Sequence, residues 1–228
     1  MKQLFTFSIL FLIAFNLKAQ TGTYNSLLQK YVDKKGNVDY KNLKKEETKL
    51  TEYLSFLAKT TPQKSWSNNK TKAFWINAYN AYTLKIILDN YPTKSIKDIN
   101  GPWRKKIVTI GNDQLSLGEI EHSILRKMNE PRIHFAINCA SISCPNLLNE
   151  AFTASKIEAQ LERTTKAFIN SDKNKISASN VKISEIFESA LFSKKRFKAL
   201  GFTAVTAATS NGKSVTDSVA ASQDHSGQ

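Results

Sequence analysis

Hydrophobic residues recur with a helical period over several stretches of the chain. This pattern predicts five helices, and they span Tyr24 to Val32, Leu43 to Ala58, Asn69 to Asp89, Leu117 to Met128, and Ser155 to about Ile169. The helix from Asn69 to Asp89 is apolar around most of its circumference, which is typical of a buried central helix. Ser67 is placed to cap its start, and Pro92 follows its end.

Shorter alternating segments predict a small amount of β-structure. Ile107 to Ile110 and Gln114 to Leu117 flank Gly111-Asn112-Asp113, which is a hairpin pattern. A third strand is predicted from Arg132 to Asn138, and a late hairpin pairs Lys175 to Ser177 with Val181 to Ile183. The fold class expected is α+β, a mostly helical single domain around a small antiparallel sheet.

Serine and glutamate three residues apart predict the starts of two helices. Ser116 with Glu119 and Ser155 with Glu158 both have the spacing of a capping box. In a capping box the side chain of each residue accepts a hydrogen bond from the backbone N–H of the other. The first pair opens the predicted helix that ends at Met128, and the second opens the helix that ends near Ile169.

The two ends of the chain differ in composition from the middle. Lys2 precedes a nearly apolar run from Leu4 to Leu17, and Ala19 stands before a plausible cleavage point at Gln20. This is the pattern of a secretory signal peptide over residues 1–19. We expect one domain over residues 20–200 and a disordered, Ser/Thr/Ala-rich tail over 201–228. The mature protein is therefore expected to be exported, periplasmic or extracellular, with no integral membrane segment.

The chain is strongly basic. It has 33 Lys and Arg against 19 Asp and Glu, a formal net charge of +14. Such a surface favours anionic partners, although scattered lysines are also typical of solvated faces. Export and the lack of any nucleic-acid-binding motif argue against a nucleic-acid partner.

Candidate chemistry is concentrated between Arg132 and Pro145, where both cysteines and one of three histidines lie. Strand alternation would place Cys139 on the apolar face and His134 on the opposite, more polar face. Cys144 precedes Pro145, a residue favoured at the first position of a helical turn. A thiol that caps such a turn would have a lowered pKa. Cys144 is therefore the candidate nucleophile.

Other polar residues could assist this thiol. His122 falls at the edge of the apolar stripe of its helix, so His122 and His134 are both candidate general bases. Asn77 and Asn80 are three residues apart on the central helix and face the same way. Their amides could orient a catalytic histidine or polarise a carbonyl, or they could hold a neighbouring loop in place.

Several motifs, in order, resemble a known family. They are Val38-Asp39-Tyr40, Phe74 to Ala81, Gly101-Pro102-Trp103, Leu115 to Arg126, and His134 to Pro145. Together they resemble the domain of unknown function 547, over roughly residues 24–187. The resemblance implies that His122, Cys139, Cys144, Asn77 and Asn80 are motif positions, but it implies no reaction. From Glu188 onward the sequence departs from the family, so the resemblance implies an altered or truncated end of the domain.

Three functions remain open from the sequence. The first is a cysteine-dependent hydrolase or acyltransferase, with Cys144 as nucleophile and His122 or His134 as base. The second is a non-catalytic envelope binding module with a Cys139–Cys144 disulfide, whose partner is a peptide or an anionic envelope component. The third is a zinc site made by the same two histidines and two cysteines, although their spacing is not that of a zinc finger. No cofactor is expected for the first two.

Overall fold

The computed structural model of the protein describes residues 21–141, 143–176, 181–182, 184 and 186. The predicted signal peptide and tail lie outside these residues. The described part begins with a helix over residues 21–31, and a bridge between Val32 and Val38 closes the turn that follows. The longer helices that follow are α3 (Glu47–Ala58), α4 (Asn68–Asp89) and α6 (Ile157–Ile169), with the short α2 (Tyr40–Leu43) before them.

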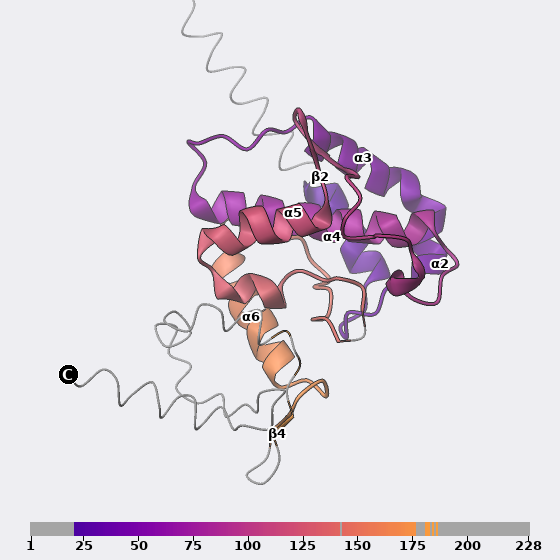
Figure 1. Ribbon diagram of the computed structural model, residues 1–228, viewed down its shortest axis with the longest axis vertical. Coiled ribbons are helices and arrows are strands. Elements are labelled where there is room, and N and C mark those ends of the chain that lie inside the picture. The colour runs from indigo at the N-terminus through magenta and orange to yellow at the C-terminus, as the bar shows by residue number, and fades with distance from the viewer. Residues whose placement is uncertain (1–20, 142, 177–180, 183, 185, 187–228) are drawn as a thin grey trace, which may run out of the picture.

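Helix α4 runs across the middle of the molecule, as Figure 1 shows. Helix α3, helix α6 and the helical run that starts at Leu117 all contact it. Ser67 caps its start by accepting a hydrogen bond from the N–H of Lys70, as predicted. The side chains of α4 are buried almost without interruption from Lys72 to Leu88. The uniform apolar pattern therefore reflects burial on all sides.

The predicted hairpin is present. Strand β1 (Val108–Ile110) pairs antiparallel with β2 (Asp113–Leu115). Gly111 occupies the turn with φ +59°, a left-handed conformation that favours glycine. Its Cα also lies close to the segment that follows α3, because a Cβ built there would be 2.5 Å from Oγ1 of Thr61. A second antiparallel pair joins β3 (Lys175–Ile176) to β4 (Val181–Lys182), close to its predicted position. The fold is therefore mostly helical α+β, as expected.

The helix predicted from Leu117 to Met128 is divided into three kinds of turn. It begins with α5 (Leu117–Glu119), continues as the π-helix η3 (Ile120–Leu125) and ends as the 3₁₀ turn η4 (Arg126–Met128). The predicted capping box is formed, since Ser116 Oγ accepts from the N–H of Glu119 and the Glu119 carboxylate accepts from the N–H of Ser116. The capping box could be predicted from the sequence, but the π-helix η3 could not.

The strand predicted from Arg132 to Asn138 is wrong. Residues Pro131–Phe135 form the 3₁₀ helix η5, with Pro131 in its first turn. Glu130 accepts a hydrogen bond from the N–H of Arg132 and caps it. All five residues are buried, so the segment has no solvent face to produce alternation. The predicted separation of Cys139 from His134 onto opposite strand faces does not apply.

The second predicted capping box is also wrong. Helix α6 begins at Ile157, and its cap residue, Lys156, makes no capping bond through its side chain. Ser155 lies 3.4 Å from the hydroxyl of Thr153 instead. Glu158 is used in an ion-pair cluster described below.

The hydrophobic core includes residues from Tyr24 to Leu161. Among the described residues, no helix has the length and apolar character needed to cross a membrane.

Candidate functional site

Asn80 fixes the segment that leads to the cysteines. Its Nδ2 donates to the carbonyl of Ala136 at 3.0 Å, and its Oδ1 accepts from the N–H of Asn138 at 2.8 Å. The side chain is 3% exposed, so both bonds are shielded from water. These two bonds are those expected of an amide that holds a neighbouring loop, one of the roles predicted for Asn80.

Asn138 continues this hydrogen-bonded arrangement into the cysteine loop. Its Nδ2 donates to the carbonyl of Pro145 at 2.6 Å, and its Oδ1 accepts from the N–H of Ala140 at 2.9 Å. Lys173 closes the outer side, because its ammonium group donates to the carbonyl of Cys144 and, at 2.7 Å, to Oδ1 of Asn146. The ends of the loop are therefore tied to each other and, through Asn80, to helix α4.

Cys139 and Cys144 form a disulfide across this loop. Cys144 is buried, and its N–H donates to the carbonyl of Ser141 in a turn. In the described structure no helix begins at Pro145, so the predicted cap is wrong. The cause is that the backbone around Pro145 is held by Asn138. Neither the free thiol nor the helix terminus needed for a lowered thiol pKa is present.

The two candidate histidines occupy different environments. His134 in η5 is buried, and its Nδ1 lies 4.0 Å from the carboxylate of Glu121. Burial lowers the pKa of His134 to about 4; the charge of Arg126 acts in the same direction, and that of Glu121 opposes it. His134 is therefore neutral at pH 7. His122 is exposed on η3. Within the described chain, no hydrogen bond joins either ring to Cys144.

The π-helix determines the partner of Arg126. At its end the N–H of Arg126 bonds the carbonyl of Glu121, five residues earlier. This spacing aligns the two side chains, and Nη2 of Arg126 lies 2.7 Å from the carboxylate of Glu121. Arg126 thus pairs with Glu121, whose carboxylate also lies 4.0 Å from Nδ1 of His134. The sequence contained both residues and gave no sign of the widened turn.

Asn77 belongs to a second clamp, which holds the segment before α6. Its amide donates to the carbonyl of Phe152 at 2.8 Å and accepts from the N–H of the same residue at 2.9 Å. Gln160 holds the flanking positions, accepting from the N–H of Thr153 and donating to the carbonyl of Ala151. Both side chains are buried. Asn77, like Asn80, is therefore occupied by backbone groups.

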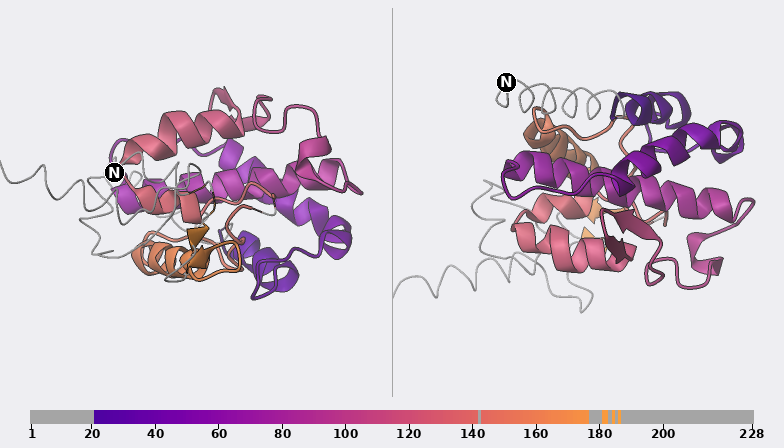
Figure 2. Two further views of the ribbon diagram at one scale, coloured as in Figure 1. Left: turned by 60° about the horizontal axis from the view of Figure 1, so that its bottom comes forward. Right: turned by 90° about the horizontal axis from the view of Figure 1, so that it is seen from above.

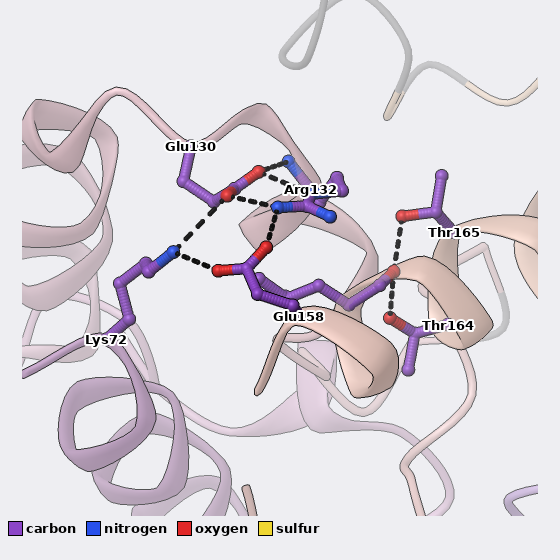
Figure 3. Close-up of polar contacts among 7 residues, drawn as sticks. Lys72, Glu130, Arg132, Glu158, Thr164 and Thr165 are labelled. Carbon is purple, nitrogen blue, oxygen red and sulfur yellow. Dashed lines mark hydrogen bonds and ion pairs between the residues drawn. The ribbon is translucent and has the colours of Figure 1, made fainter. Parts of the chain in front are cut away.

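Four charged side chains form a compact cluster between α4, η5 and α6, shown in Figure 3. Arg132 binds both oxygens of Glu130, at 2.7 and 2.6 Å, and reaches Glu158 at 2.6 Å. Lys72 lies 3.4 Å from Glu130 and 3.1 Å from Glu158. The two positive and two negative charges cancel, which is how charges are tolerated at low exposure. The cluster has no unpaired charge to offer a ligand.

A groove of about 630 Å³ lies between the first helix, α3, α4 and the segment before α6. Aromatic side chains line it: Tyr53, Phe56, Trp66 and Phe74. Lys70 and Lys156 are also part of its lining, and Nζ of Lys70 stands 4.0 Å from the centre of the Trp66 ring. This volume is within the range of ligand sites, about 300–1,000 Å³. Sequence reasoning missed this site, although a tryptophan within the polar segment before α4 was an available clue.

The zinc alternative receives no support from the geometry. Among the described residues, no group of three or more His, Cys, Asp or Glu side chains is arranged to hold a metal ion. Both cysteines are engaged with each other, and zinc needs them as thiolates.

Comparison with known proteins gives a family match for part of the chain. Residues 63–169 match the family described as "Protein of unknown function, DUF547". The match supports the identification of this domain over a segment that contains α4, the hairpin, the cysteine loop and α6. The match is narrower than the resemblance noted over residues 24–187. Searches of curated proteins and of solved structures each found no significant match.

Proposed function

We propose that this DUF547 protein is a non-catalytic binding module of the cell envelope, in which a Cys139–Cys144 disulfide stabilises the loop after η5. The disulfide carries the proposal, because it engages both cysteines of the chain. A covalently paired sulfur cannot act as a nucleophile until it is reduced. The expected signal peptide agrees with this, since disulfides persist in the oxidising compartments that exported proteins enter.

The remaining members of the expected catalytic set also favour a structural role. Asn77 and Asn80 each bond two backbone groups, and in the described part of the chain neither amide is hydrogen-bonded to a histidine. Their bonds keep two loops attached to α4. A hydrolase would need one of these amides, or a histidine, next to the thiol. The groove lined by Trp66 and Lys70 supplies the ligand-sized surface that a binding module needs.

The test is alkylation of the native protein, isolated from the exporting cell without reductant and analysed by peptide mass spectrometry. We expect nearly all molecules to carry the Cys139–Cys144 disulfide and to resist iodoacetamide. A parallel sample reduced before alkylation shows that both peptides can be detected. Rapid alkylation of Cys144 in the unreduced protein below about pH 7.5, well under the ordinary thiol pKa of about 8.5, would overturn the proposal in favour of a thiol enzyme.

A further inference from the structure

The groove between α3 and α4 has a chemical character that specifies its ligand more closely. We infer, building on the proposed binding function, that it binds an anionic amphiphile. The alkyl chain lies against the aromatic side chains, and a single carboxylate or phosphate head meets Lys70 and Lys156. Three features of the groove lead to this: its apolar wall, its occupied backbone and its unbalanced charge.

The wall of the groove offers apolar contact along its length. Tyr53 and Phe56 come from α3, Phe74 from α4, and Trp66 from the linker between these helices. Trp66 and Phe74 pack edge to face with their centroids 5.5 Å apart, which fixes both rings. Gly22 adds open space on the first helix, since a Cβ built there meets nothing within 4 Å. Such a wall binds a flexible alkyl chain through burial rather than through directed bonds.

The backbone N–H and C=O groups of residues 151–153, which border the groove, are all hydrogen-bonded within the protein. At Ala151 the N–H bonds Oδ1 of Asn25 and the carbonyl bonds Gln160. At Phe152 both groups bond Asn77. At Thr153 the N–H bonds Gln160, and the carbonyl accepts from the N–H of the residue that precedes α6.

These six bonds exclude one common mode of recognition. A peptide that adds to a strand edge needs free N–H and C=O groups in a row, and the segment over residues 151–153 has none. A ligand with many hydroxyl or amide groups would leave its own polar atoms unsatisfied against the aromatic wall. A ligand with one polar end avoids this cost.

Charge sets the sign of that polar end. Glu150 is the carboxylate of the groove lining, and Arg163 already pairs with it. Within the described part of the chain, Lys70 and Lys156 have no carboxylate partner. Lys70 is held over the Trp66 ring, and burial lowers its pKa with no acidic neighbour to oppose the shift. An anionic head would supply the missing countercharge.

The test is isothermal titration calorimetry of the full, disulfide-bonded chain at low ionic strength. The probes are dodecanoate, dodecyl phosphate, dodecyl maltoside and dodecyltrimethylammonium, each below its micelle concentration. We expect one saturable site for both anions, and binding at least tenfold weaker for the neutral and cationic probes. The two anions separate a carboxylate source from a phosphate source.

Substitutions in the groove test whether the binding site lies there. Lys70→Met and Lys156→Met should each weaken dodecanoate binding about three- to fivefold, and the double variant roughly tenfold or more. Lys127→Met is the matched control, because Lys127 is exposed on η4 outside the groove. Ala154→Trp should abolish binding by filling the groove from an exposed position, with circular dichroism to show that the variant is folded.

Each remaining outcome identifies what has failed. Equal affinity for all four probes, or full affinity in Ala154→Trp, would overturn the inference. An acidic, aromatic hexapeptide that binds where dodecanoate does not would overturn it as well and indicate a peptide partner. In both cases the intact disulfide leaves the binding-module proposal standing. A free, reactive Cys144 would refute that proposal whatever the titrations show.

Discussion

Asn80→Leu is the substitution that best separates a structural amide from a catalytic one. Leucine keeps the branched shape of asparagine and fills the same space, so little cavity is created. The change removes the donor to the carbonyl of Ala136 and the acceptor for the N–H of Asn138. Both backbone groups lose their partner, and Ala136 is only 3% exposed.

The expected loss of stability follows from these two groups. A buried polar group without a partner costs about 1–3 kcal/mol. Asn138 is half-buried, so water can partly replace its lost bond. We therefore expect the free energy of unfolding to fall by about 2–4 kcal/mol, a large part of a typical 5–15 kcal/mol.

Urea unfolding of the oxidised protein, followed by circular dichroism, measures this loss. With a slope of about 2 kcal/mol/M, the midpoint should fall by roughly 1–2 M. Asn68→Leu is the control, since Asn68 is exposed at the start of α4 and should change stability by less than about 0.5 kcal/mol. A midpoint for Asn80→Leu equal to that of the control would refute the structural role and reopen the catalytic one.

Three further results are expected. The Cys139→Ser/Cys144→Ser variant should lose about 2 kcal/mol in urea unfolding, because the disulfide closes a short loop, and dithiothreitol should bring the wild type to the same value. The pKa of His134 near 4 lies below that of an unfolded histidine, about 6.5, so the unfolded state takes up the proton first. Stability should then fall as the pH drops from 6.5 towards 4, by up to roughly 3 kcal/mol, and His134→Gln should flatten this part of the curve, whereas an unchanged curve would contradict the burial of the ring. Arg132→Met should cost about 3 kcal/mol because it leaves two carboxylates with only Lys72 to balance them, and the side chain of Glu130 is only 10% exposed. Glu158→Gln, at a side chain 55% exposed, should cost under about 1 kcal/mol; equal losses would show that the cluster is solvated.

Local sequence patterns were enough to predict much of the fold. The length and burial of α4, the hairpin around Gly111 and the capping box at Ser116 were all predicted correctly. Each depends on residues that are neighbours in sequence, where a helical period, a turn glycine or a capping spacing acts within a few positions. The family motifs belong to the same level, and they led to the DUF547 assignment.

The strand prediction failed because the segment is buried on every side. The stretch from Pro131 to Phe135 has no exposed face, so its alternation of residue types was not evidence for a strand. The same error placed Cys139 and His134 on two faces of a strand that does not exist. The π-helical turn of η3, which pairs Arg126 with Glu121, was also not predicted by any sequence pattern.

The candidate site was determined by contacts that span long sequence distances. Asn80 meets Ala136 across 56 positions, and Asn77 meets Phe152 across 75. The sequence determined that these buried amides must find partners, because an unsatisfied amide in a core is costly. Only the tertiary structure decided that the partners are loop backbone rather than histidines. It also paired the two cysteines and brought Trp66 and Lys70 to the wall of one groove, because folding alone sets which distant surfaces meet.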